Sequence, residues 1–211
     1  MKTEDLIFLL ANDPLPSKPP AWRLPLAATL ALILTLGMVM QGWGWHPQFP
    51  ALLGSASFQF KSLWLLALAL SSCMLLWHLA RPAHNLGHGL QGIGLAWLAM
   101  VGAGAYHVWQ VEPTERLSLL IGQSWWSCPL SIALIALPWL PVCLLYLRQM
   151  APTRLVLGGA NAGFLAGALA TAIYSLHCTE TSYAFFSIWY VAGMGISTAV
   201  GAFLGPRYLR W

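Results

Sequence analysis

Charged residues are rare in this sequence. Asp, Glu, Lys and Arg make up 8% of its 211 residues, whereas 58% are hydrophobic. A soluble domain usually carries about a quarter charged residues, and the mean hydropathy of +0.67 shows the same imbalance. The composition therefore excludes an ordinary soluble domain. The net charge of +4 comes from Lys and Arg scattered between apolar runs, so we expect no direct contact with nucleic acid.

Six apolar runs are long enough to cross a bilayer, which requires about 20 residues in a helix. They lie at about 24–42, 60–79, 90–109, 129–147, 155–176 and 185–205. The pattern predicts an all-α membrane protein, with a tail over 1–21 and six transmembrane helices in a domain over 22–211. Acidic residues and prolines precede the first run, unlike the short basic start of a cleaved signal peptide, so we expect this run to be retained. Pro138 and Pro141 predict a kink in the fourth run.

The distribution of Lys and Arg predicts how the runs are oriented. Eight of these residues lie on one side of the predicted spans: Lys2, Lys18, Arg23, Arg81, Arg148, Arg154, Arg207 and Arg210. Only Lys61 and Arg116 lie on the other side. Because cytoplasmic loops carry the excess of Lys and Arg, both termini are predicted to be cytoplasmic.

Two classes of membrane protein are disfavoured by what the runs lack. No acidic residue falls within them, and we expect no charged side chain near the middle of the membrane. Ion-coupled transporters and proton pumps need such buried ionisable groups. The sequence also lacks a Cys-x-x-Cys pair, which thiol oxidoreductases use for rapid exchange. A periplasm-facing membrane thiol oxidoreductase is therefore kept only as the alternative function.

The four cysteines fall into two groups. Cys73 and Cys143 lie within predicted spans, where a buried free cysteine usually behaves as a small hydrophobic residue. Cys128 and Cys178 are predicted at the outer surface, which in a bacterium is an oxidising compartment. This second pair has three interpretations: a structural disulfide, a redox switch, or a binding site for a thiophilic metal ion.

The metal interpretation needs further ligands beside the two cysteines. His177 precedes Cys178 directly, and Glu180 or His107 is a candidate for a further position. Thiolate and imidazole ligands suit Zn²⁺ or Cd²⁺. However, the spacing matches no standard zinc pattern. No other cofactor is predicted, and the metal ion would act as a signal.

The fifth run contains glycines at intervals of four. Gly159, Gly163 and Gly167 form a tandem GxxxG pattern, and small residues on one face let two helices approach closely in lipid. We interpret the pattern as packing within the bundle. The alternative is a seam between two copies in a homodimer, and the spacing alone does not separate the two.

The N-terminal tail contains a short amphipathic segment, TEDLIFLLA, over residues 3–11. Thr3 is the predicted N-cap, and a helix of this length is not stable alone in water. Its apolar residues must be covered, either by the bilayer and bundle or by the groove of a protein partner. Acidic residues beside them argue against anionic lipid. The predicted contact residues are Thr3, Glu4, Asp5, Leu6, Ile7, Leu9 and Leu10.

Five blocks of sequence together resemble the NrsF family of bacterial anti-sigma factors. They are MKTEDLIFLLAND at the start, GQSWWSCPLSIALIALP, APTRLVLGGANAGFLAGALATAIYSLHCTE, WY at 189–190 and GAFLGPRYLRW at the end. The resemblance runs from end to end, and it is strongest over 120–211 and the first thirteen residues.

The resemblance implies a regulator rather than an enzyme. Such proteins are multi-pass proteins of the bacterial inner membrane that sequester a sigma factor of the extracytoplasmic-function class. The short cytoplasmic N-terminal segment is the natural contact with that sigma factor. The matching cysteines, Cys128 and Cys178, are associated in the family with sensing metal or oxidative stress. Cys73 and Cys143 lie outside the matching blocks, so no role is carried onto them.

Overall fold

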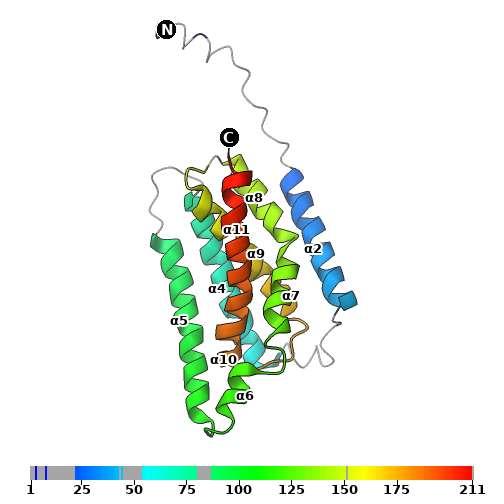
Figure 1. Ribbon diagram of the computed structural model, residues 1–211, viewed down its shortest axis with the longest axis vertical. Helices are drawn as coiled ribbons and strands as arrows, with labels where there is room; N and C mark the ends of the chain where they lie inside the picture. The colour runs from blue at the N-terminus through cyan, green and yellow to red at the C-terminus, as the bar shows by residue number, and fades with distance from the viewer. Residues whose placement is uncertain are drawn as a thin grey trace.

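The computed structural model describes residues 3, 8, 22–42, 44, 54–79, 87–150 and 152–210. Within these ranges the chain is almost entirely helical and contains no β-strand. The elements are α2 (Arg23–Gly42), α4 (Ala56–Leu79), α5 (Gly87–Gln110), α6 (Arg116–Ile121), α7 (Ser127–Ala136), α8 (Trp139–Gln149), α9 (Leu155–Tyr174), α10 (Tyr183–Phe185), the π-helical turn η1 (Phe186–Tyr190) and α11 (Val191–Tyr208). The long helices run up and down beside one another, with α9 in the middle (Figure 1).

Helices α2, α4, α5 and α9, and the continuous helix formed by α10, η1 and α11, are each long and apolar enough to cross a membrane. A sixth crossing results if α7 and α8 together form one bent span. The helices coincide with the six predicted runs to within a few residues, and they are compatible with a multi-pass membrane protein. The short helix α6 was not predicted. It lies in the loop between α5 and α7 at the lower end of Figure 1.

The kink predicted in the fourth run is confirmed. Helix α7 ends at Ala136, Pro138 is the N-cap of α8, and the two helices meet at 45°. A proline inside a helix removes one backbone hydrogen bond and clashes with the preceding turn, which explains the break. Pro141 is tolerated because it falls in the first turn of α8, where backbone N–H groups have no partner within the helix.

Helix α9 is the centre of the bundle. It contacts α2, α4, α7, α8 and α11, and 67% of its most apolar stretch is buried inside the protein. A helix that is apolar on all sides is typical of a buried position or a membrane span. The small residues of α9 let its neighbours approach the helix axis closely.

The glycines of α9 face α11 within the same chain. A Cβ atom added at Gly159 would lie 2.7 Å from the Gly205 Cα atom, and one added at Gly167 would lie 3.0 Å from the Met194 Cα atom. Between them, a Cβ atom at Gly163 would collide with the backbone carbonyl of Ser197. These three glycines therefore form the α9–α11 interface. A homodimer would have to use another surface.

One polar link joins α9 to α4 inside the bundle. The Ser72 hydroxyl donates to the Asn161 side-chain oxygen at 3.0 Å, and the Asn161 amide donates to the Ser72 carbonyl at 2.9 Å. Both residues are buried, so each polar group finds its partner only in the other helix. The pair fixes the register of α4 against α9, and sequence patterns gave no indication of it.

Replacing Asn161 with Ala should lower the free energy of unfolding by about 1 kcal/mol, because interhelical hydrogen bonds in membrane proteins contribute about 0.6–2 kcal/mol. The measurement is the thermal unfolding midpoint of the detergent-purified protein. Ser187→Ala is the matched control, since that hydroxyl bonds only to the Ala184 carbonyl of its own helix. Adding Ser72→Ala to Asn161→Ala should cost less than the two single effects combined. Full additivity would contradict a direct link.

Candidate functional site

Cys128 and Cys178 come from distant parts of the sequence and meet at one end of the bundle. Cys128 is the second residue of α7, and Cys178 lies in the loop that follows α9. Because α7 packs against α9, the two thiols lie close enough to interact electrostatically. Their exposed fractions are 0% and 3%. Both are free thiols, so this conformation is that of the reduced pair.

Two tyrosines accompany the thiols. The Tyr174 hydroxyl lies beside the Cys128 thiol, and the Tyr190 hydroxyl lies beside the Cys178 thiol. The two rings meet edge to face, with 6.2 Å between their centroids. The Tyr190 hydroxyl is fully buried and makes no well-aligned hydrogen bond. Any change at Cys178 therefore acts directly on a packed aromatic side chain of η1.

Lys61 is the third component of the site. The sequence analysis counted it among the basic residues of the predicted outer side and gave it no other role. Helix α4 begins at Ala56, which places Lys61 in its second turn with an exposed fraction of 2%. Its side chain lies near both Cys178 and Cys128. It belongs to the end of α4 nearer the thiols, away from the middle of the helix.

The surroundings of Cys178 determine the pKa of its thiol. Burial raises the pKa of Cys178, because a thiolate loses its hydration there. The Tyr190 hydroxyl, the Lys61 ammonium and the backbone N–H of Glu180 oppose this increase in pKa. A thiolate, rather than a thiol, reacts with oxidants and binds metal ions. The reactivity of Cys178 is thus set by the balance between burial and these donors.

The remaining predicted metal ligands point elsewhere. The His177 Nδ1 atom donates to the Gly44 carbonyl at 3.0 Å, so only its Nε2 atom could bind a metal. The Glu180 carboxylate accepts from the Gln123 backbone N–H at 2.8 Å. His107 stacks edge to face on Tyr183 with 5.7 Å between centroids. Over the described ranges, no three His, Cys, Asp or Glu side chains are grouped to hold a metal ion.

A water-accessible cavity of about 610 Å³ lies next to the thiol cluster. Its lining residues come from α6, the turns before and after it, and the loop after α9: Thr114, Leu117, Ser118, Ile121, Gly122, Gln123, Thr179 and Glu180. Gly122 has a φ of +62°, and a Cβ atom there would lie 2.6 Å from the Phe185 ring, so glycine is required at this turn. Thr179 and Glu180 directly follow Cys178. The cavity therefore lies beside the loop that carries this thiol, although Cys178 itself does not line it.

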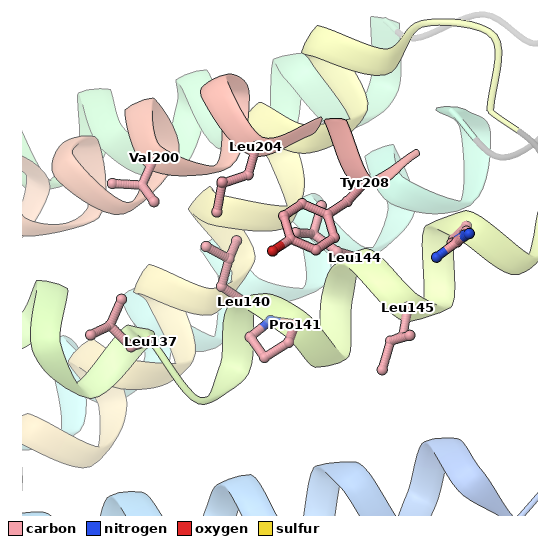
Figure 2. Close-up of a pocket in the computed structure, with 9 residues that line it drawn as sticks. Leu137, Leu140, Pro141, Leu144, Leu145, Val200, Leu204 and Tyr208 are labelled. Atoms are coloured by element: carbon pink, nitrogen blue, oxygen red, sulfur yellow. The ribbon is translucent and has the colours of Figure 1, made fainter. Parts of the chain in front are cut away.

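A second hollow lies toward the other end, between α8 and α11 (Figure 2). It has a volume of about 330 Å³, and nearly all of its lining is aliphatic: Leu137, Leu140, Pro141, Leu144, Leu145, Val200 and Leu204, with Arg148 and Tyr208. Such a lining suits a hydrocarbon chain rather than a polar ligand. None of the predicted site residues contributes to it.

Most of the predicted partner-binding segment lies outside the described residues. Glu4, Asp5, Leu6, Ile7, Leu9 and Leu10 belong to that part. Thr3 and Phe8 are described, and both are helical and exposed. Thr3 is already helical, whereas an N-cap residue lies just outside its helix, so the predicted cap position is wrong.

Sequence reasoning found the two cysteines but missed Lys61, Tyr174 and Tyr190. One signal was present, since Lys61 is the only lysine after residue 18. It also shares a helical face with Leu65, Leu68 and Ser72, all buried. Both tyrosines lie in blocks that resemble the NrsF family, Tyr174 just before SLHCTE and Tyr190 in WY, but the sequence did not show that they meet the thiols.

The bundle and the site define a helical protein, compatible with several membrane crossings, whose distinctive chemistry is a buried pair of thiols. The chain belongs to the NrsF family, described as negative regulators of sigma F, whose profile matches residues 10–211. It is 36% identical over 219 residues to the probable anti-sigma-F factor NrsF of Azospira oryzae, and 35% identical over 221 residues to the anti-sigma-F factor NrsF of Caulobacter vibrioides. Each alignment covers 100% of both chains. No solved structure matches the chain. These relatives are regulatory proteins rather than catalysts.

Proposed function

We propose that this chain is a multi-pass anti-sigma factor of the bacterial inner membrane. It binds an extracytoplasmic-function sigma factor through its cytoplasmic N-terminal segment, and it releases that factor when Cys128 and Cys178 react with an oxidant or a thiophilic metal ion. The observation that carries this proposal is the full-length match to two anti-sigma-F factors. Regulation by sequestration needs no catalytic residues, only two conformations with different affinities for the sigma factor.

The charge distribution supports a cytoplasmic position for the end of the bundle where α2 begins and α11 ends (Figure 1). Five arginines of the described ranges belong to that end: Arg23, Arg148, Arg154, Arg207 and Arg210. The charged residues of the described ranges at the opposite end are two basic ones, Lys61 and Arg116, and three acidic ones, Glu112, Glu115 and Glu180. An excess of basic residues marks the cytoplasmic side of a membrane protein. The thiol site then faces the periplasm, where oxidants and metal ions arrive first.

The bundle provides a physical connection between the two ends. Cys128 lies in the first turn of α7. The chain continues through the bend at Pro138 into α8, which ends near the arginines. Cys178 follows α9, whose other end also lies among the arginines. A covalent bond or a metal ion between these thiols would pull the start of α7 against the end of α9. Closely packed helices respond to such a force by shifting as units.

Release requires a large difference in binding free energy between the two conformations. Changing the fraction of bound sigma factor from 99% to 1% takes about 5.5 kcal/mol of difference in binding free energy between the two states. The reaction at the two cysteines must supply a difference of this size for full release, and a smaller difference would give only partial release.

A pull-down from the native host tests the proposal. The tagged full-length chain is extracted in a mild detergent, beside a version lacking residues 2–13 and one in which Leu6 and Leu10 are replaced by Glu. Mass spectrometry should find a sigma factor with the full-length chain and at least tenfold less with both variants. The Leu variants keep the tail length, so they separate lost contacts from lost spacing. If none of the three samples contains a sigma factor, the proposed function is wrong.

A further inference from the structure

The hollow between α8 and α11 follows from the bend in the fourth apolar run. Helix α7 packs against α11, but beyond the 45° bend α8 makes little contact with α11 and packs on α9 and α2 instead. Because α11 also packs on α9, α8 and α11 lie on a common neighbour with a space of about 330 Å³ between them. Leu140 of α8 and Leu204 of α11 point toward each other across this space (Figure 2). The break at Pro138 thus opens a groove beside α11.

The hollow is as long as one leaflet of a membrane is thick. From Leu137, the C-cap of α7, to Arg148, in the last turn of α8, the chain rises about 17 Å at 1.5 Å per helical residue. The hydrocarbon core of a bilayer is about 30 Å thick, so each leaflet contributes about 15 Å. A smaller hollow of about 170 Å³ continues toward the thiol end and shares the lining residues Leu137, Leu140 and Val200. One hydrocarbon chain of a lipid therefore fits along the groove.

The lining of the hollow offers very little to water. Apart from Arg148 and the Tyr208 hydroxyl, all of its side chains are aliphatic. A water molecule held in a cavity needs about two to four polar partners, which an aliphatic lining does not provide. A space left empty loses the dispersion contacts of its walls. A lipid chain restores these contacts, so it is the occupant that suits the apolar part of the groove.

The charged group of the hollow lies at the arginine-rich end. Arg148 is exposed and lines the hollow, and the described acidic residues, Glu112, Glu115 and Glu180, all belong to the opposite end of the bundle. Its guanidinium therefore has no carboxylate partner among the described residues. A guanidinium matches the oxygens of a phosphate group with two parallel hydrogen bonds. Tyr208, which is 56% exposed, brings a hydroxyl to the same end of the hollow.

We propose that this hollow binds one anionic phospholipid from the leaflet at the arginine-rich end. An acyl chain lies along Leu137, Leu140 and Leu204, and the phosphate accepts hydrogen bonds from Arg148. Because an aliphatic lining accepts the chain of any lipid, the selection for an anionic headgroup comes from the arginine. The proposal rests on the proposed function only for the membrane location. The bound lipid bridges α8 and α11, which both end on the side where the sigma factor is proposed to bind.

Native mass spectrometry of the full-length chain in detergent tests this proposal. The probes are phosphatidylglycerol, which is anionic, and phosphatidylcholine with the same acyl chains, which is zwitterionic. One phosphatidylglycerol per chain should bind about fivefold more tightly than phosphatidylcholine, since one basic residue contributes about 1 kcal/mol toward anionic lipid. Arg148→Gln should abolish this preference. Equal binding of the two lipids to the native chain, or a preference that survives in Arg148→Gln, would overturn the proposal.

Arg207→Gln is the matched control for the headgroup. It removes the same charge from the same end, but the Arg207 guanidinium lies 4.7 Å from the centroid of the Phe203 ring, and Arg207 does not line the hollow. This variant should keep the preference for phosphatidylglycerol. An equal loss in Arg148→Gln and Arg207→Gln would mean that the arginines attract anionic lipid collectively, and the assigned site would be wrong.

Val200→Trp tests the acyl-chain part of the site. Val200 lines both hollows, so a larger side chain there should fill the space and weaken the binding of both lipids. Ala199→Trp is the control, since Ala199 is exposed on the same helix and lines neither hollow.

Unchanged lipid binding in Val200→Trp would overturn the proposal, as would a dimer that forms without lipid and is lost in this variant, because a second copy would then occupy the hollow. Arg148→Gln and Val200→Trp alter different parts of the site, so one suffices if the other does not accumulate as folded protein. The measurement involves no sigma factor, and its outcome is therefore independent of the pull-down.

Discussion

Cells that carry Cys178→Ser or Cys128→Ser should no longer change the activity of the sigma factor when they are exposed to peroxide or cadmium. A serine hydroxyl forms no disulfide, and at neutral pH it neither ionises nor binds soft metal ions. If the native chain produces at least tenfold induction of a sigma-dependent reporter, each variant should stay within about twofold of one level with and without stress. A tenfold change corresponds to about 1.4 kcal/mol of differential binding, so the assay detects even partial coupling.

Cys143→Ser and Cys73→Ser are the matched controls for this experiment. Cys143 is buried between helices at the other end of the bundle, and Cys73 is exposed on α4. Both should preserve the response, because neither belongs to the cluster around Lys61. Normal induction in both Cys128→Ser and Cys178→Ser would show that the pair is structural and does not carry the signal.

The fold could be predicted from the sequence because a long apolar run has few structures open to it. A helix satisfies its backbone polar groups within the segment, so each long apolar run was predicted to be helical, and the fourth is divided into α7 and α8. The break at Pro138 was predictable for the same reason, since it removes one such bond. By contrast, apart from the glycine pattern of the fifth run, nothing in the apolar runs showed which residues face inward. Helix α4 is almost equally apolar on all sides, and Lys61, Leu65 and Ser72 therefore gave no visible stripe.

The candidate site was predictable only at the level of its cysteines. Cys128 and Cys178 are reactive residue types at the ends of two apolar runs, which marks them in any sequence. Their environment depends on how α4, α7 and α9 are arranged around one another, and this arrangement follows from side-chain fit rather than from periodicity. That is why Tyr174 and Tyr190 were missed. Three further metal ligands were proposed from their positions in the chain: His177 and Glu180 lie close to Cys178 in the sequence, and His107 lies near the end of the third apolar run. In the structure each of them makes a separate hydrogen bond or ring contact.

The second large effect is expected at the α9–α11 interface. Replacing Gly163 with Ala places a methyl group against the Ser197 carbonyl and 3.0 Å from the Thr198 Cα atom. Overpacking a dense interior costs about 1–3 kcal/mol, and here the obstacle is backbone, which cannot rotate aside like a side chain. We therefore expect a loss of about 3 kcal/mol in the free energy of unfolding. The chain should be much less abundant in membranes and should unfold at a clearly lower temperature after purification.

Gly195→Ala is the control that makes this prediction specific. Gly195 belongs to α11, but a Cβ atom added there would meet no atom within 4 Å, so its replacement should change stability by no more than about 0.5 kcal/mol. Equal stability of Gly163→Ala and Gly195→Ala would mean that α9 and α11 can separate without cost. In that case the two helices could not form the rigid part of the bundle. A change at Cys178 would then be absorbed locally, and the proposed connection from the thiol site to the arginine-rich end would lose its physical basis.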